Sequence, residues 1–227
     1  MKKTNITLLL AVLLSLGFAV SSFAAVVGSL HDMTRRGSLQ QTVDAQVCVY
    51  CHSPHVDDIA VIADYNPLWN ATVQTSTTFV PYGANNRSFT FDGVVSDPLV
   101  GPSRLCMSCH DGSIALDSAL PGSSGITIGA NFQVGNGSSL ASDHPVGFDY
   151  IAVGGSGIGA GTGGTDLEIN GAGSPYAGAT IADFLFSSAA GEMMTCATCH
   201  DVHDNANGSF LLADNTGSAL CLGCHVK

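Results

Sequence analysis

The chain has 227 residues, with 7 lysines and arginines against 18 aspartates and glutamates and a formal net charge of −11 at pH 7. An acidic balance of this size argues against nucleic acid as a partner, because binding a phosphate backbone requires a basic surface, and favours basic partner proteins instead. The length predicts one domain, and charged residues are only 11% of the total, so long amphipathic helices are not expected.

Residues 1–24 have the pattern of a secretory signal peptide. Two lysines precede an apolar run from Ile6 to Val20, and Ser22-Phe23-Ala24 has the small residues of a cleavage site. The alternative is a retained membrane anchor, but the run is shorter than the roughly 20 residues that a spanning helix needs. We therefore expect residues 1–24 to be removed and residues 25–227 to form a single exported domain with no transmembrane segment.

The pattern Cys-x-x-Cys-His occurs four times and contains all eight cysteines of the chain. Two thiols three positions apart lie on one turn, so they can form thioether bonds to the two vinyl groups of one porphyrin while the following histidine binds the iron. The sequence therefore predicts four covalently bound c-type haems. The motifs are Cys48-Cys51-His52, Cys106-Cys109-His110, Cys196-Cys199-His200 and Cys221-Cys224-His225.

Zinc sites, redox dithiols and disulfides are the alternatives for paired cysteines. Four-thiolate zinc sites would leave four identically placed histidines without a role, and disulfides would explain the even cysteine count but not the histidines. Haem attachment outside the cytoplasm accounts for both residue types and agrees with the export signal.

Little regular secondary structure is expected elsewhere. Short helices are predicted around the motifs, and β-branched and aromatic residues predict two short strands between the first two motifs. The Gly- and Ser-rich stretch at 154–178 predicts a surface loop, since no Gly-Lys-Ser/Thr follows it as in a phosphate-binding loop. The fold class is thus a mostly coil multihaem cytochrome whose core is built by four stacked haems. The predicted helices are 43–52, 103–111, 193–204 and 218–225, the last capped by Thr216 or Ser218, and the predicted strands are 72–80 and 88–95.

Four histidines lie outside the motifs, one for each predicted haem. We therefore expect every iron to carry two imidazoles, a ligand set that gives lower potentials than histidine with methionine. Methionine sulfur is the alternative sixth ligand at Met33, Met107, Met193 and Met194, but Met107 lies inside a motif and the last two crowd the third motif. The predicted distal ligands are His31, His55, His144 and His203.

His55 and His203 each stand three residues after a motif histidine, in Cys-His-Ser-Pro-His and Cys-His-Asp-Val-His. On a helical turn, two imidazoles at this spacing lie on the same side of the chain, so they cannot bind opposite faces of one iron. We expect His52 and His200 to bind their own haems while His55 and His203 bind neighbouring ones. Close packing of the haems would follow.

Several segments around these residues resemble the exported multihaem cytochromes of metal-respiring bacteria, in particular the tetrahaem outer-surface cytochromes that polymerise into haem-wired filaments. The resemblance covers essentially the whole chain after the signal peptide, although some relatives carry a histidine where this chain has Ala71. It is carried by Gly28-Ser-Leu-His-Asp32, Cys48-Val-Tyr-Cys-His-Ser-Pro-His55, Tyr65-Asn-Pro-Leu-Trp-Asn70, Leu105-Cys-Met-Ser-Cys-His-Asp-Gly-Ser-Ile-Ala115, Asp143-His-Pro-Val-Gly-Phe-Asp-Tyr150 and Leu220-Cys-Leu-Gly-Cys-His225.

The resemblance implies a particular role for His31. In the filament family a histidine near the N-terminus completes a haem of the adjacent subunit, and His31 lies on an N-terminal arm between Gly28 and Gly37. The alternative is an intramolecular ligand that folds back onto a haem of its own chain.

Irons with two imidazole ligands predict electron transfer rather than substrate chemistry. The resemblance implies a subunit of an extracellular conductive filament at the outer cell surface, with copies of itself, redox proteins and acceptors such as metal oxides as partners. A monomeric periplasmic shuttle is the alternative. A multihaem reductase, which would need an open iron position, and a haem-storage protein fit the motifs less well.

Overall fold

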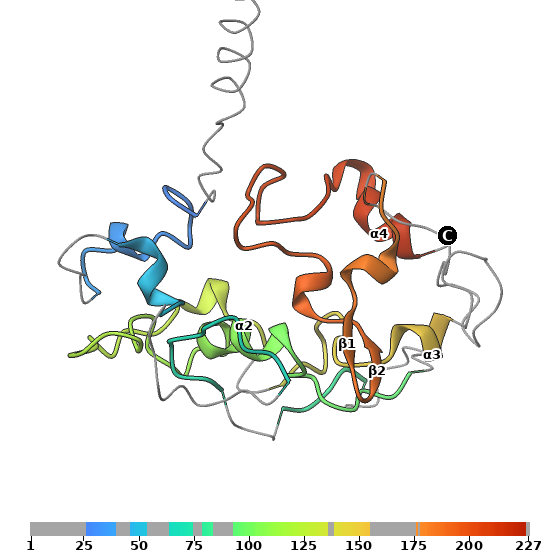
Figure 1. Cartoon of the computed structure of the whole chain (residues 1–227), viewed down its shortest axis with the longest axis horizontal. Coiled ribbons are helices and arrows are strands. Elements are labelled where there is room, and N and C mark those ends of the chain that lie inside the picture. The colour runs from blue at the N-terminus through green and yellow to red at the C-terminus, as the bar shows by residue number, and fades with distance from the viewer. Residues whose placement is uncertain are drawn as a thin grey trace, which may run out of the picture.

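The computed structural model describes residues 26–39, 46–53, 64–74, 79–83, 93–135, 139–154, 176 and 178–225. Over these ranges the chain is mostly coil, with short helices and one two-stranded sheet (Figure 1), as expected for a small multihaem cytochrome. The α-helices are α2 (Pro102–His110), α3 (Tyr150–Gly154) and α4 (Ala219–Cys224), and the strands are β1 (Phe186–Ser188) and β2 (Gly191–Met193). Single 3₁₀ turns lie at Met33–Arg35, Val47–Tyr50, Ala130–Phe132, Ile181–Phe184, Cys196–Thr198 and Thr216–Ser218.

Helices form at the second and fourth motifs, close to the predicted bounds, whereas the first and third motifs form only single 3₁₀ turns. Two local features stop the turns from continuing. Ser53 precedes a proline, which disfavours the helical region for the residue before it. In the third motif, Asp201 accepts a hydrogen bond from the backbone N–H of His203 at 2.8 Å and so forms a turn in place of a helix.

The start of α4 differs from the predicted cap. Neither Thr216 nor Ser218 caps a helix with its side chain, and Ser218 itself has the left-handed φ of 65°. Instead the side-chain oxygen of Asn215 accepts a hydrogen bond from the N–H of Leu220 at 3.2 Å. The side chain of Asn215 therefore caps the start of α4 in place of the predicted hydroxyl.

The strands lie where the sequence did not predict them. β1 and β2 form an antiparallel hairpin that pairs Phe186 with Met193. The predicted strand residues inside the described ranges (72–74, 79–80 and 93–95) form only single bridges, Val80 with Ser139 and Val95 with Phe148. The other predicted strand residues, like most of the Gly- and Ser-rich stretch, lie outside the described residues.

The described residues form small hydrophobic clusters and not one large core. The largest comprises Phe148, Tyr150, Val153, Ile181 and Met194, and the partly buried Cys199 and Cys224 of the third and fourth motifs pack against it. Two smaller clusters lie at Phe79, Leu99, Met107 and Leu140 and at Val73 and Leu105.

A close contact also joins two segments that are remote in sequence. The Phe186 ring packs so closely on Gly101 that a Cβ there would lie 2.6 Å from it, and Gly101 has a φ of 53°, so glycine is required on both grounds.

In Figure 1 the N-terminal segment lies on the same side of the molecule as α2, and α4 lies on the opposite side. Within the described ranges, no helix has the length and apolarity needed to cross a membrane.

Candidate haem-binding sites

All eight cysteines lie in described parts of the chain, and all of them are free thiols. Two are exposed and six are partly buried. Burial raises the pKa of the Cys51 and Cys199 thiols to about 11. Each of these motifs therefore presents a neutral thiol on a tight turn, in which the N–H of the motif histidine bonds to the carbonyl of the first cysteine, as from His52 to Cys48 at 2.8 Å.

Six of the histidines lie in three facing pairs, each of one motif histidine and one predicted distal histidine. A metal ion lies about 2 Å from an imidazole nitrogen, so two imidazoles on opposite sides of one metal have ring centres about 6 Å apart. All three pairs have the separation that a shared iron requires. The ring centres are 6.0 Å apart for His31 and His110, 6.0 Å for His52 and His203, and 6.3 Å for His144 and His225.

These pairs bring together residues from remote parts of the sequence. The ring of His203, which follows the third motif, lies beside that of His52 in the first motif. His31 faces His110 of its own chain, the arrangement of the intramolecular alternative. His200 is the motif histidine with no facing imidazole among the described residues, and His55, its predicted neighbour-haem counterpart, lies outside them.

Backbone carbonyls lie at hydrogen-bond distance from a ring nitrogen of three motif histidines. The Nδ1 atoms of His52 and His110 lie 2.8 Å from the carbonyls of Pro67 and Phe132, and that of His200 lies 3.0 Å from the carbonyl of Ser209. A carbonyl oxygen only accepts hydrogen bonds, so Nδ1 carries the proton. The Nε2 lone pair is then free for a metal ion, with its basicity raised by the hydrogen bond.

The turns that hold the motif histidine have the same main-chain arrangement at the first and third motifs, and we call each of them a carbonyl clamp. Sequence reasoning missed this repeat. In the first, a residue with left-handed backbone, Leu68 at φ 60°, accepts from the N–H of Ser53, and His52 forms a bridge with Trp69. The sequence signal was the recurrence of a short apolar segment after each Cys-His-x-x-His, Pro-Leu-Trp-Asn in one case and Ser-Phe-Leu-Leu in the other.

In the third motif the same positions are filled by other residues. Phe210 has a φ of 57° and accepts from the N–H of Asp201, and His200 forms a bridge with Leu211. Leu68 and Phe210 are different side chains at the same left-handed position, and each turn uses main-chain carbonyls to accept from the histidine ring and from the following N–H.

His31 is positioned by its own turn and by a distant loop. Asp32 accepts from the N–H groups of Gly28 at 2.8 Å and Thr34 at 3.2 Å, which fixes the arm around it. The His31 ring stacks on Phe210 with ring centres 4.4 Å apart and planes at 13°. Burial, followed by repulsion from His110, lowers the pKa of His31 to about 4, so the imidazole is neutral and able to bind a metal.

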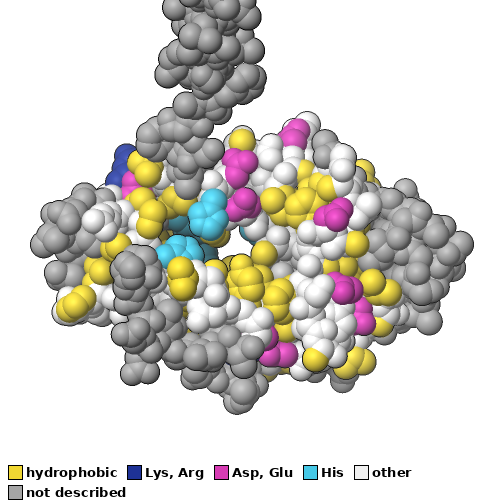
Figure 2. All heavy atoms as spheres, in the orientation of Figure 1, with side chains coloured by type: hydrophobic (Ala, Val, Ile, Leu, Met, Phe, Trp, Pro, Cys, Tyr) yellow, Lys and Arg dark blue, Asp and Glu magenta, His cyan; other side chains and the backbone are white. Residues whose placement is uncertain are grey.

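The third motif touches the elements that carry the second and fourth. The hydroxyl of Ser103 in α2 accepts from the N–H of Cys196 at 3.1 Å. Cys199 and Cys224 pack against one hydrophobic cluster. Figure 2 shows histidine side chains at the edge of a hollow in this face of the molecule.

The methionines and one tryptophan also bear on the choice of cofactor. Met107, Met193 and Met194 are between 0% and 4% exposed, and Met107 and Met194 lie in hydrophobic clusters, so they serve packing. The indole nitrogen of Trp69 is buried and has no acceptor among the described residues, and the ring lies 6.1 Å from that of His52. A buried donor beside a motif histidine fits a cofactor with its own acceptor groups, as porphyrin carboxylates are.

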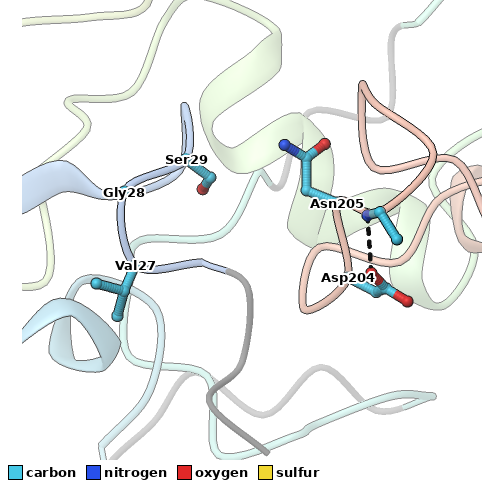
Figure 3. Close-up of a pocket in the computed structure, with 6 residues that line it drawn as sticks. Val27, Gly28, Ser29, Asp204 and Asn205 are labelled. Atoms are coloured by element: carbon cyan, nitrogen blue, oxygen red, sulfur yellow. Dashed lines mark hydrogen bonds between the residues drawn. The ribbon is translucent and has the colours of Figure 1, made fainter.

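A cleft of about 360 Å³ separates the N-terminal arm from the loop after the third motif (Figure 3). It is lined by Val27, Gly28 and Ser29 on one side and by Asp204, Asn205 and Ala206 on the other. The two segments carry His31 and His203.

Comparison with known proteins agrees with the motif chemistry. Residues 188–227 match a family model described as a doubled CXXCH motif, which covers the third and fourth motifs. No curated protein matches the chain. The match indicates covalent binding of haem c and a multihaem protein like the c-type cytochromes, with a role in electron transfer.

Proposed function

We propose that the chain transfers electrons through four c-type haems, each bound by two imidazoles. The single observation that carries this proposal is the set of three histidine pairs with ring centres 6.0 to 6.3 Å apart. Haem iron with both axial positions filled exchanges electrons without binding a substrate, which supports a carrier rather than an enzyme.

The chain's own residues provide the ligand set. The motif histidines His52, His110, His200 and His225 are the proximal ligands, and His203, His31 and His144 face the first, second and fourth of these sites. His55 is the distal ligand proposed for the site of His200, by analogy with His203, which reaches from the third motif to the first. This reciprocal exchange would place the two sites side by side.

The resemblance to filament-forming cytochromes supports a further step, that copies of the chain assemble into an extracellular conductive filament. The pairing of His31 with His110 is compatible with assembly, because an arm that docks on its own chain can make the same contact with a neighbour when arms are exchanged. The intramolecular pairing itself favours the second candidate, a discrete periplasmic shuttle.

Electron microscopy of the haem-staining extracellular fraction from cells that express the chain tests the filament proposal. Uniform filaments with a short subunit repeat are expected, and they should be absent for His31→Ala if the arm joins copies. Discrete particles alone would overturn the filament and leave the shuttle. Filaments with unchanged haem ligation in His31→Ala would remove His31 from the joint.

The haem ligation is tested separately by the absorption and electron paramagnetic resonance spectra of the purified protein. Four low-spin haems that bind no carbon monoxide when reduced are expected. A high-spin haem in the unmodified protein would show that one iron lacks its second imidazole and would reopen the reductase interpretation.

A further inference from the structure

The turn at Ser209 and Phe210 is unusual in holding two consecutive residues other than glycine in left-handed backbone, with φ values of 49° and 57°. Such residues are stable there only when their contacts fix them. Phe210 is nevertheless only 6% exposed, so its side chain is part of the packed interior. The turn therefore holds a defined position.

Two contacts from this one turn reach histidines assigned to different haems. The carbonyl of Ser209 accepts from Nδ1 of His200, which belongs to the third motif. The ring of Phe210 stacks on His31, which faces His110 of the second motif. The turn thus connects the proximal ligand of one site to the distal ligand of another.

The corresponding turn at the first motif makes only the first kind of contact. Leu68 has the same left-handed backbone, and the carbonyl before it accepts from Nδ1 of His52. The Leu68 side chain, however, is 56% exposed. The clamp itself therefore needs no buried aromatic ring, and the stacking of Phe210 on His31 is an addition to it.

We propose that Phe210 is a positioning residue that holds the imidazole of His31 in line with His110. This proposal rests on the ligand set of the proposed function. His31 lies on an arm that is anchored by its own local turn, and a planar ring 4.4 Å from the imidazole and 13° from parallel restricts its rotation. Removing the ring frees the imidazole to turn away from the iron.

The test compares Phe210→Ala with Leu68→Ala in the haem-loaded protein. Both substitutions keep the carbonyl clamp, and only the first removes a ring that contacts a ligand. In Phe210→Ala the haem of the second motif should change from low-spin to high-spin and bind carbon monoxide when reduced, and added imidazole should restore the low-spin spectrum. Leu68→Ala should keep the spectrum and the carbon monoxide binding of the unmodified protein.

Phe210→Leu keeps the interior filled but removes the planar face, so it separates stacking from folding. It should show the same spectral change to a smaller extent, with the haem content of the unmodified protein. If Phe210→Ala and Phe210→Leu both bind no more carbon monoxide than Leu68→Ala, Phe210 does not position His31. If the unmodified protein already binds carbon monoxide at the second motif, the error lies instead in the proposed ligand set.

Discussion

His31 illustrates how burial prepares a side chain to bind a metal. Its imidazole lies on an N-terminal arm that the sequence shows only as a Gly-flanked segment, yet the structure packs it between Phe210 and His110. Desolvation and the neighbouring imidazole both penalise the charged form, so the pKa falls to about 4. Docking of the arm and loss of the proton are therefore coupled.

This coupling predicts a stability that depends on pH. The pKa of His31 is 6.5 in the unfolded chain and about 4 in the folded one, so the unfolded state binds more protons between these values. The free energy of unfolding should be constant above pH 6.5 with respect to this group and fall as the pH is lowered towards 4. Iron binding at the same nitrogen would extend the loss to lower pH.

Thermal unfolding of the protein and of His31→Gln across this pH range measures the effect. The variant has no titrating group at this position, so its melting temperature should fall less between pH 6.5 and 4. Parallel curves for the two proteins would contradict the coupling.

Among the elements, α2 connects two motifs. It carries the second motif, and its Ser103 hydroxyl accepts from the N–H of Cys196 in the third. Ser103 and Ser108 are both fully buried in this helix, but Ser108 donates to the carbonyl of Arg104 one turn earlier in the same helix. The two serines are therefore a matched pair for substitution: the hydrogen bond of Ser103 joins two elements, and that of Ser108 lies within the helix.

Ser103→Ala should destabilise the protein by about 1 kcal/mol, because it leaves the partly buried N–H of Cys196 without its acceptor. Ser108→Ala should cost less, since the carbonyl it leaves already lies within the helix. Denaturant unfolding of both variants at equal haem content checks the difference. Equal losses would show that the contact between α2 and the third motif contributes no stability of its own.

At this scale the sequence predicted some elements and missed others for identifiable reasons. Short helices were predicted around all four motifs, and they form at two of them, as α2, which starts with Pro102, and as α4. At the first and third motifs the helical turn ends after one turn, because of the proline after Ser53 and the side chain of Asp201. The helix prediction took neither feature into account. The β1–β2 hairpin is held by contacts such as Phe186 on Gly101, which join segments remote in sequence.

The candidate site was more predictable than the fold. The motif cysteines and histidines follow from spacing alone, and the four spare histidines follow from counting. Their pairing did not, since it depends on which segments fold together: His31 with His110 and His144 with His225 join residues 79 and 81 positions apart.

The whole molecule has small, separate clusters of buried residues in its described ranges. The described part of the chain has only short helices and one two-stranded sheet, and domains with little buried apolar surface often need a cofactor to offset their chain entropy. We therefore expect folding to depend on haem attachment, as metal sites often determine the folding of small domains.

The chain produced without haem attachment should show no cooperative thermal transition and no near-ultraviolet circular dichroism signal, while the haem-loaded chain shows both. Calorimetry of the two forms under reducing conditions measures this, with thiols kept free to exclude disulfides. A cooperative transition in the haem-free chain would show that the polypeptide clusters suffice for folding.

The carbonyl clamps have a consequence for how the protein tolerates sequence change. Because main-chain oxygens of Pro67, Phe132 and Ser209 hold the ring nitrogens, substitutions of these side chains that keep the backbone path leave the grip on each imidazole intact. The sequences of the surrounding loops can therefore change during evolution while the geometry at each imidazole is retained. Distant homologues of this chain would then share the spacing of a few histidines and cysteines, although the rest of their sequences had diverged.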